Sequence, residues 1–217
     1  MRNYVVVGSG SEISQSFQKL LAKSNIPFFT ISRSTSNNSK HLKVNDYLKE
    51  LDNIKDFIEK IENPTVIYFN GFLAENRNIQ NPDLSQIELT DYINFQVPYF
   101  LTRELSIKTH IKKYIFISSI ASVRARNKNY IYGLSKNKLE KSIKFLDLSS
   151  YLVIRFGKVE SKMSKGHKNP PFTMTCDEAA KAIFKKLNNR GVTHASFGIY
   201  LSRIFLLILP QKIIDRF

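Results

Sequence analysis

The chain has 217 residues, of which 42% are hydrophobic, and it carries a formal net charge of +15. This length and composition predict one globular domain with a sizeable core and argue against an intrinsically disordered chain. The single cysteine, Cys176, excludes a disulfide framework and a cysteine-based zinc site. It fits a reducing, cytoplasmic compartment, and we expect no metal site.

The positive charge indicates anionic partners, such as a phosphorylated cofactor, a phosphorylated substrate or an acidic membrane surface. The basic residues are spread along the chain, so a compositional bias that places lysines on solvated faces explains them equally well. We expect no nucleic-acid partner, because no RNA-binding or helix-turn-helix signature accompanies the charge. The N-terminus does not read as a signal peptide, and the longest late apolar run, 204–209, is too short to span a bilayer.

The first expected strand, 4–7, leads into a glycine-containing turn and then an amphipathic helix. A strand that breaks on glycines and enters a helix gathers backbone N–H groups at the positive end of the helix dipole, and this arrangement binds phosphate. An ordinary βα turn has the same local pattern. The candidate phosphate-binding residues are Gly8, Ser9, Gly10, Ser11, Glu12 and Ile13.

The second strand, 27–31, ends at Ser32-Arg33-Ser34. In a dinucleotide-binding fold this point lies near the adenosine ribose, where an acid binds the 2′-hydroxyl and an arginine accommodates a 2′-phosphate. Arg33 is present and no acidic residue adjoins it, so the sequence favours NADP(H) over NAD(H). The alternative is an exposed loop arginine.

The remaining chain alternates between strands and helices. Further strands are expected at 40–44, 65–69, 113–117, 151–155 and 192–200, and helices at 45–61, 83–109, from about Tyr132 to 146, and 175–187. Pro98 lies inside the second of these helices, where it removes a backbone hydrogen bond, kinks the helix and leaves the carbonyl of Asn94 without its usual partner. Residues 158–175 are polar, basic and proline-containing, as in a substrate-covering loop.

This alternation predicts an α/β fold, a Rossmann-like doubly wound parallel sheet. Right-handed crossovers bring the carboxyl ends of the strands to one edge, where ligands bind. We divide the chain into a domain at 1–198, which includes the loop 158–175, and an amphipathic C-terminal segment at 199–217. The residues that follow strands are Gly8, Arg33, Asn70, Ser119 and Gly157.

The stretch from Ser118 to Lys136 concentrates the chemistry. Ser118 and Ser119 follow the strand 113–117, and Tyr132 and Lys136 lie four residues apart on one helix face. A hydroxyl at a strand end, with a phenol and an ammonium group on one helix face, can move a proton to or from a carbonyl or an alcohol. Each residue taken alone also fits a structural role, as a packed tyrosine, a solvated lysine or a strand-capping serine.

These residues resemble the short-chain dehydrogenase/reductase family over nearly the whole chain, to about residue 190. Tyr132 and Lys136 form the only Tyr-x-x-x-Lys match, and Ser119 lies thirteen residues before Tyr132, the usual family spacing. Asn94, in Asn-Phe-Gln-Val-Pro, is similar to the family's helix-borne asparagine. Asn70-Gly71 looks like the end of the family's Asn-Asn-Ala-Gly segment.

The chain also departs from the family pattern. Arg155-Phe-Gly157 looks like the family's Arg-Pro-Gly, with Phe156 in place of proline, and Asn70-Gly71 lacks the alanine. Glu12 and Ser14 stand where the second and third glycines of the turn are usual, although a variant of the turn has Glu followed by Ile, so we expect binding to be retained. None of these changes removes a reacting group.

The resemblance, together with the chemistry of the groups, implies a mechanism. Tyr132 is the general acid in reduction and the base in oxidation, and Lys136 with the oxidised nicotinamide lowers the phenol pKa. Lys136 also holds the nicotinamide ribose, and Ser119 hydrogen-bonds the carbonyl oxygen. The helix carbonyl of Asn94 holds a water that links Lys136 to solvent. Asn70 and Gly71 belong to the cofactor site.

Two further features concern the substrate. Basic residues in the loops near the pocket attract a phosphate or pyrophosphate on the substrate, or they are exposed loop charges. They are Arg124, Arg126, Lys128, Lys158, Lys162, Lys165, His167 and Lys168. The segment 199–217 is apolar and basic and is broken at Pro210, which is typical of an interfacial amphipathic segment or of a helix packed on the domain or on a dimer partner.

Three interpretations follow. The tail and the turn variant are similar to bacterial reductases of sugars attached to polyprenyl phosphate. The first interpretation is therefore an NADP(H)-dependent keto-sugar or lipid-linked sugar reductase of envelope polysaccharide synthesis, a cytoplasmic homodimer with peripheral contact at the inner face of the membrane. The second is a general cytosolic carbonyl or 3-oxoacyl-type reductase. The third is a non-catalytic NADP-sensing or scaffold protein, against which the presence of Ser119, Tyr132 and Lys136 argues.

Overall fold

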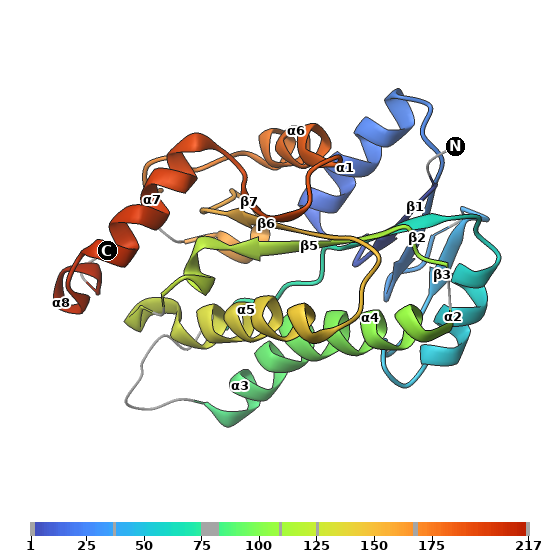
Figure 1. Ribbon diagram of the computed structural model, residues 1–217, viewed down its shortest axis with the longest axis horizontal. Helices are drawn as coiled ribbons and strands as arrows, with labels where there is room; N and C mark the ends of the chain where they lie inside the picture. Colours follow the sequence, from blue (N-terminus) through green and yellow to red (C-terminus); the bar gives the residue numbers. More distant parts are fainter. Residues whose placement is uncertain are drawn as a thin grey trace.

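The structure is a computed structural model that describes residues 3–36, 38–74, 83–108, 110–124, 126–166 and 169–215, without the side chains of Lys108 and Lys128. The described residues form a seven-stranded parallel sheet in the order β3-β2-β1-β4-β5-β6-β7 (Figure 1). The strands are β1 (Asn3–Val7), β2 (Phe28–Ser32), β3 (His41–Lys43), β4 (Pro64–Tyr68), β5 (Lys113–Ser119), β6 (Tyr151–Phe156) and β7 (Gly191–His194).

Helices cover both faces of the sheet, as Figure 1 shows. The helices are α1 (Glu12–Lys23), α2 (Leu51–Glu59), α3 (Leu84–Asp91), α4 (Val97–Lys108), α5 (Tyr130–Ser142), α6 (Cys176–Lys186), α7 (Phe197–Ile208) and α8 (Gln211–Ile214). α1 and α6 pack on one face, over a core that contains Val6 and Ile115, and α2, α4 and α5 pack on the other, over Val5 and Phe116. The alternate side chains of β1 therefore face opposite cores, as strand geometry requires. The predicted doubly wound sheet is confirmed.

The strand order reverses at β1, which pairs with β2 on one side and β4 on the other. The chain leaves β1 at Gly8, whose φ is +79°, a conformation that favours glycine. A Cβ atom at Gly8 would lie 2.9 Å from the backbone nitrogen of Asn70, so only glycine allows the segments after β1 and β4 to approach this closely. Such a reversal point opens a crevice at the carboxyl edge of the sheet.

The helix expected at 45–61 is shorter than predicted, because α2 spans only Leu51–Glu59. Asp46 Oδ1 accepts hydrogen bonds from the backbone N–H groups of Leu48 and Lys49, and Glu50 Oε1 accepts from Asn45 and Asp46. These side chains compete with helical hydrogen bonds and hold residues 47–50 as turns.

The disturbance expected at Pro98 takes the form of a π-helical segment, and the kink itself stays a prediction. The helix predicted at 83–109 consists of three consecutive segments: α3, a π-helical segment at Tyr92–Gln96, and α4. In the π-helical segment the N–H of Val97 donates to the carbonyl of Tyr92, five residues back. This widened turn stands immediately before the proline, where the ordinary ladder has to change. Asn94 lies inside it and is fully buried.

The last strand and the C-terminal segment also differ from expectation. β7 ends at His194 instead of continuing to residue 200, because the Ser196 side chain accepts a hydrogen bond from the N–H of Ile199 and caps α7. The division of the chain at residue 198 stays a prediction, and α7 spans that boundary. No helix among the described residues is both long and apolar enough for a membrane crossing.

α7 and α8 lie beyond the carboxyl ends of the strands (Figure 1). Arg124 attaches them to the domain, because its guanidinium donates to the carbonyls of Leu206 and Leu209, at 3.0 and 2.7 Å, and to the Gln211 side chain at 2.9 Å. Asp215 accepts a bond from the N–H of Asn127, and Ile214 is 1% exposed. One face of the C-terminal segment therefore packs on the domain.

Candidate active site

A cavity of about 1530 Å³ lies at the carboxyl edge of the sheet. It is larger than the ~300–1,000 Å³ typical of a pocket for one drug-sized ligand, so it has room for a dinucleotide and a second molecule. Its walls come from the glycine-containing turn, the ends of the central strands, the loop 158–175 and the C-terminal helices. The predicted site residues in its wall are Gly8, Gly10, Ser11, Glu12, Ile13, Arg33, Asn70, Gly71, Ser119, Tyr132 and Lys136.

Two predicted residues lie behind the cavity wall. Ser9 is buried in the turn, and its carbonyl accepts a hydrogen bond from Gln18 at 2.9 Å. Asn94 supports the wall through its side chain, whose Oδ1 accepts from the N–H of Phe72 at 2.9 Å and whose Nδ2 donates to the Phe72 carbonyl at 2.8 Å. The water-holding role of its own carbonyl stays a prediction.

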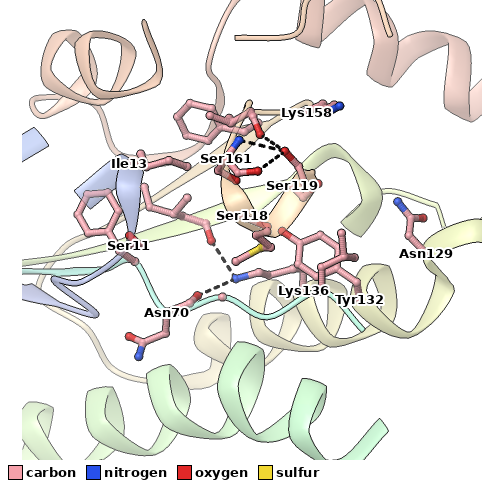
Figure 2. A pocket seen from close by; sticks show the side chains of 18 of the residues that line it. Ser11, Ile13, Asn70, Ser118, Ser119, Asn129, Tyr132, Lys136, Lys158 and Ser161 are labelled. Carbon is pink, nitrogen blue, oxygen red and sulfur yellow. Dashed lines mark hydrogen bonds between the residues drawn. The ribbon is translucent and has the colours of Figure 1, made fainter. Parts of the chain in front are cut away.

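Ser119 and Tyr132 meet because α5 packs closely against the 3-10 turn that follows β5. A Cβ atom at Gly133 would lie 2.7 Å from the carbonyl oxygen of Ala121, so glycine is needed for this approach. The Ser119 hydroxyl accepts a hydrogen bond from the N–H of Ala121 at 3.2 Å, and it lies close enough to the Tyr132 phenol to lower the phenol pKa. Figure 2 shows the two side chains in the same pocket as Lys136.

Burial raises the pKa of Tyr132 to about 12, although the neighbouring Ser119 hydroxyl acts in the opposite direction. The pKa lowering expected from Lys136 is not seen in the protein alone, where desolvation outweighs it. The effect expected from an oxidised nicotinamide stays a prediction. At neutral pH the phenol is therefore protonated.

Lys136 is 3% exposed, and its ammonium group donates to two backbone carbonyls, those of Asn70 at 3.3 Å and Ile117 at 3.2 Å (Figure 2). Its Nζ atom lies 5.9 Å from the centroid of the Tyr132 ring. Burial lowers the pKa of Lys136 to about 8, and the negative charge of Glu140 opposes this shift.

Glu140 is the centre of a buried network below Lys136. Its Oε1 accepts from the hydroxyls of Ser118 and Ser122, both at 2.6 Å, and its Oε2 forms an ion pair with Arg155 Nη2 at 2.5 Å. Arg155 Nε lies 3.1 Å from both carboxylate oxygens. The network joins α5 to the carboxyl ends of β5 and β6.

The glycine-containing turn has the features of a phosphate cradle. The first turn of α1 leaves the N–H groups of Glu12 and Ile13 without intrahelical partners at the positive end of the helix dipole. The space beside Gly10 is open, because a Cβ atom added there would come no nearer than 3.5 Å to a neighbouring atom, the Ser34 Oγ. Asn70 Oδ1 is buried and has no hydrogen-bond partner among the described residues. A dinucleotide cofactor fits these groups.

Glu12, which replaces a glycine of the usual turn, connects the turn to the substrate loop. Its Oε2 accepts a hydrogen bond from the N–H of Lys162 at 2.6 Å. Residues 162–164 form a short 3-10 helix in the loop, and Val159 pairs with Met174 across the loop base. The substitution therefore provides a link across the cavity.

The basic loop residues divide into different roles. Arg124 is used to attach the C-terminal helices, so it does not face a substrate. Arg126, Lys158 and Lys162 line the cavity. The Nε of Arg126 is buried and has no hydrogen-bond partner among the described residues. Lys165 is exposed outside the cavity wall. His167, Lys168 and the Lys128 side chain lie outside the part that the structure describes.

Sequence reasoning missed Glu140 and Tyr47. Glu140 had a local signal, since it lies four residues after Lys136 and therefore on the same helix face. Tyr47 lines the cavity, and burial raises the pKa of its phenol, a shift that Asn70 and Arg33 oppose. It had no local signal, because the stretch read as the start of a helix. Within the described ranges, no group of three or more His, Cys, Asp or Glu residues could hold a metal ion.

The lowered pKa of Lys136 predicts a pH-dependent stability. Between pH 8 and about 10.5 the unfolded state binds the lysine proton and the folded state does not, so the free energy of unfolding rises with pH in this window. Lys136→Met removes the contribution. Urea unfolding of both proteins from pH 7 to pH 10.5 should show a wild-type-minus-variant difference that grows above pH 8. A difference that is flat or falls in this window contradicts the assigned pKa.

The Glu140 network predicts a large mutational effect. Glu140→Gln leaves the Arg155 guanidinium, whose side chain is 16% exposed, without its counter-charge, and we expect a loss of about 3–5 kcal/mol in the free energy of unfolding. Asp91→Asn is the control, because it breaks an ion pair with Lys138, whose side chain is 52% exposed, and should cost under about 1 kcal/mol. Equal losses in the two variants would show that the network is not the stronger support.

No protein-family model and no curated protein matches the sequence. Among solved structures, a short-chain dehydrogenase from Burkholderia cenocepacia in complex with NADP superposes with a TM-score of 0.78 at 12% identity, covering 99% of this chain and 96% of that one. A 3-oxoacyl-[acyl-carrier protein] reductase from Brucella melitensis in complex with NAD gives 0.73 at 14% identity, with 92% and 97% covered. An aldohexose dehydrogenase from Thermoplasma acidophilum gives 0.72 at 11% identity, with 91% and 94% covered. The chain has the fold of the short-chain dehydrogenases.

Proposed function

We propose that the protein is an NADP(H)-dependent oxidoreductase of the short-chain dehydrogenase/reductase type, which interconverts a carbonyl and an alcohol. One observation carries the proposal. Ser119, Tyr132 and Lys136 come together in the wall of a cavity that also contains a phosphate cradle. Each of the three residues alone has a structural explanation. Together, and beside a crevice where the strand order reverses, they provide what hydride and proton transfer require.

The cofactor site is assigned to the cradle and its neighbours. The N–H groups of the first turn of α1 would hold the pyrophosphate, and Asn70 would use its unpaired oxygen. Asp46, an acidic residue in the same wall, already accepts a 2.6 Å hydrogen bond from Tyr92. Exposed Arg33 is then the group suited to a 2′-phosphate, so NADP(H) is favoured over NAD(H). When bound, the cofactor supplies or accepts the hydride.

The residues of the chain provide the proton chemistry. In reduction, Tyr132 donates its phenolic proton to the carbonyl oxygen, and Ser119 hydrogen-bonds the same oxygen as negative charge develops. In oxidation, Tyr132 takes the proton back. Lys136 places a positive charge below the phenol, contacts the nicotinamide ribose, and passes protons to solvent by a water held at the Asn94 carbonyl. A pKa of about 12 keeps Tyr132 protonated at neutral pH, which favours the role of acid in reduction.

For the substrate, we propose a keto-sugar or lipid-linked sugar of bacterial envelope polysaccharide synthesis. Two features of the cavity support it. Arg126 presents a guanidinium group suited to a phosphate. Phe205, Leu206, Leu209 and Ile214 form an apolar wall beside it. An amphiphilic phosphate matches this pairing of groups better than a small neutral carbonyl does.

The proposal places the protein in the cytoplasm as a homodimer, with peripheral contact of residues 199–217 at the inner face of the membrane. A general cytosolic carbonyl or 3-oxoacyl-type reductase is the second candidate. Such an enzyme would be fully soluble, and lipids would not change its behaviour. A non-catalytic NADP-binding scaffold is the third. The loop 158–175 would cover the substrate in either enzyme, since it lines the cavity from the β6 side.

Tyr132→Phe tests the reaction. The variant keeps the ring and its packing but has no proton to donate, so turnover should fall at least about a hundredfold, the loss expected for a general acid. NADPH binding, followed by nicotinamide fluorescence, should change little. Near-normal turnover would remove Tyr132 from the mechanism and leave the scaffold interpretation open.

Arg126→Ala tests the substrate class. NADPH oxidation is measured against keto-sugars and acyl carbonyls, both free and linked to a lipid phosphate. Loss of a charge-assisted contact of about 1.5–3 kcal/mol should raise the KM for phosphate-bearing substrates by roughly tenfold to a hundredfold and spare neutral ones. Lys60→Ala is the matched control, because Lys60 is an exposed basic residue outside the cavity wall and away from α7 and α8. Equal effects on neutral and phosphorylated carbonyls would favour the general reductase.

A further inference from the structure

α7 has its apolar side turned away from the domain. Its outward residues follow the spacing i, i+3, i+4, i+7, i+10 and i+11, which places them on one helix face. This outer stripe consists of Phe197, Tyr200, Leu201, Ile204, Leu207 and Ile208. Four of its members are largely exposed: Phe197 and Ile208 at 74%, Leu207 at 53% and Tyr200 at 41%. No charged residue lies within the stripe.

The inner face of α7 is fixed, so the stripe cannot turn inward. Ile199 is 2% exposed and packs tightly on Gly157. A Cβ atom added to Gly157 would lie only 2.5 Å from Ile199 Cδ1. The Phe172 ring of the substrate loop occupies the space beside Gly198, 2.3 Å from where a Cβ would be. Arg124 holds the last carbonyls of the helix.

We propose that the outer stripe is the surface with which the protein lies on a membrane that carries anionic lipids. The inference rests on the proposed function in that it specifies the peripheral membrane contact named there, and it is open to test without a redox assay. Aromatic and aliphatic side chains of this kind insert to the boundary between headgroups and acyl chains, and basic groups beside them bind anionic headgroups.

Area argues against a second copy of the chain as the occupant. A helix of twelve residues is about 18 Å long, and one face of it is about 10 Å wide. The face therefore covers about 180 Å². This area is far smaller than the ~800 Å² that each partner buries in a stable interface. A bilayer has no such requirement, because it receives the side chains individually.

Charge points to the same occupant. An anionic bilayer attracts a chain with a net charge of +15. Lys162 and Lys165 are exposed on the loop that packs on α7, and Lys212 is exposed on α8. Each such residue near an anionic surface contributes about 1 kcal/mol of attraction.

The contact gives the cavity a direction. Phe205 is 61% exposed and also lines the cavity, so it connects the outer surface of α7 with the interior. Leu206, Leu209 and Ile214 continue the apolar wall inward. The acyl part of a lipid-linked substrate would then follow this wall from the bilayer, while its polar head reaches Tyr132.

Vesicle flotation of the full chain tests the proposal. The probes are vesicles of phosphatidylcholine alone and vesicles that also contain phosphatidylglycerol. The wild type should float with the anionic vesicles only, and the double variant Leu207→Glu/Ile208→Glu should lose at least tenfold in bound fraction. Phe145→Glu is the control, because Phe145 is 89% exposed and lies outside the stripe, in the 3-10 turn Ile143–Phe145 that follows α5. It should bind as the wild type does.

The proposal is wrong if the wild type does not float, or if the double variant floats as well as the wild type does. It is also wrong if no protein floats and sedimentation shows that the wild type is a dimer and the double variant is a monomer. That result would assign the stripe to a second copy. NADPH oxidation with a water-soluble carbonyl is measured in parallel and should be equal in all three proteins. If the proteins float as expected but the wild type shows no reductase activity, the proposed function is contradicted and the membrane contact is still supported.

Discussion

The buried carboxylate of Glu140 is the group on which the geometry of the site depends. It accepts hydrogen bonds from Ser118 and Ser122 and pairs with Arg155, so it binds α5 to the ends of β5 and β6. A charge removed from water destabilises a fold unless its lone pairs are used, and here both oxygens have donors. Ser119 adjoins one of these donors, and Tyr132 and Lys136 share the helix with Glu140. The network that satisfies the carboxylate therefore also holds these three side chains in place.

The same burial has opposite effects on the two titrating residues of the site. It raises the pKa of Tyr132 to about 12 and lowers that of Lys136 to about 8, since each neutral form is favoured away from water. Glu140 opposes the second shift and so helps to keep the ammonium charged at neutral pH. A structural carboxylate thereby becomes part of the electrostatics. The Tyr132 phenol holds its proton at neutral pH, as the proposed role of acid in reduction requires, and the proposed role of base would need positive charge from Lys136 and a cofactor.

Strand runs, helix spacing and alternation were sufficient to predict the sheet. The meeting of Ser119, Tyr132 and Lys136 was predicted from their spacing together with the resemblance to the short-chain dehydrogenase/reductase family. Sequence reasoning failed where side chains compete with the backbone or find distant partners. Asp46 and Glu50 replaced a helical turn with their own hydrogen bonds, and Ser196 ended β7 by capping α7. Arg124 read as a loop charge, yet its acceptors are carbonyls more than eighty residues away, for which no local pattern exists.

α7 reverses the usual arrangement of a surface helix, which turns its apolar face to the core and its polar face to water. Here Gly198, Ser202 and Arg203 lie off the outer stripe, and the side chains that point outward are aromatic or aliphatic. The domain stabilises the inner face through Ile199 and the Arg124 bonds, so packing within the chain does not account for the outer one. A helix held in this orientation keeps its apolar surface available, and the apolar wall that continues from Phe205 into the cavity gives that surface a connection to the chemistry.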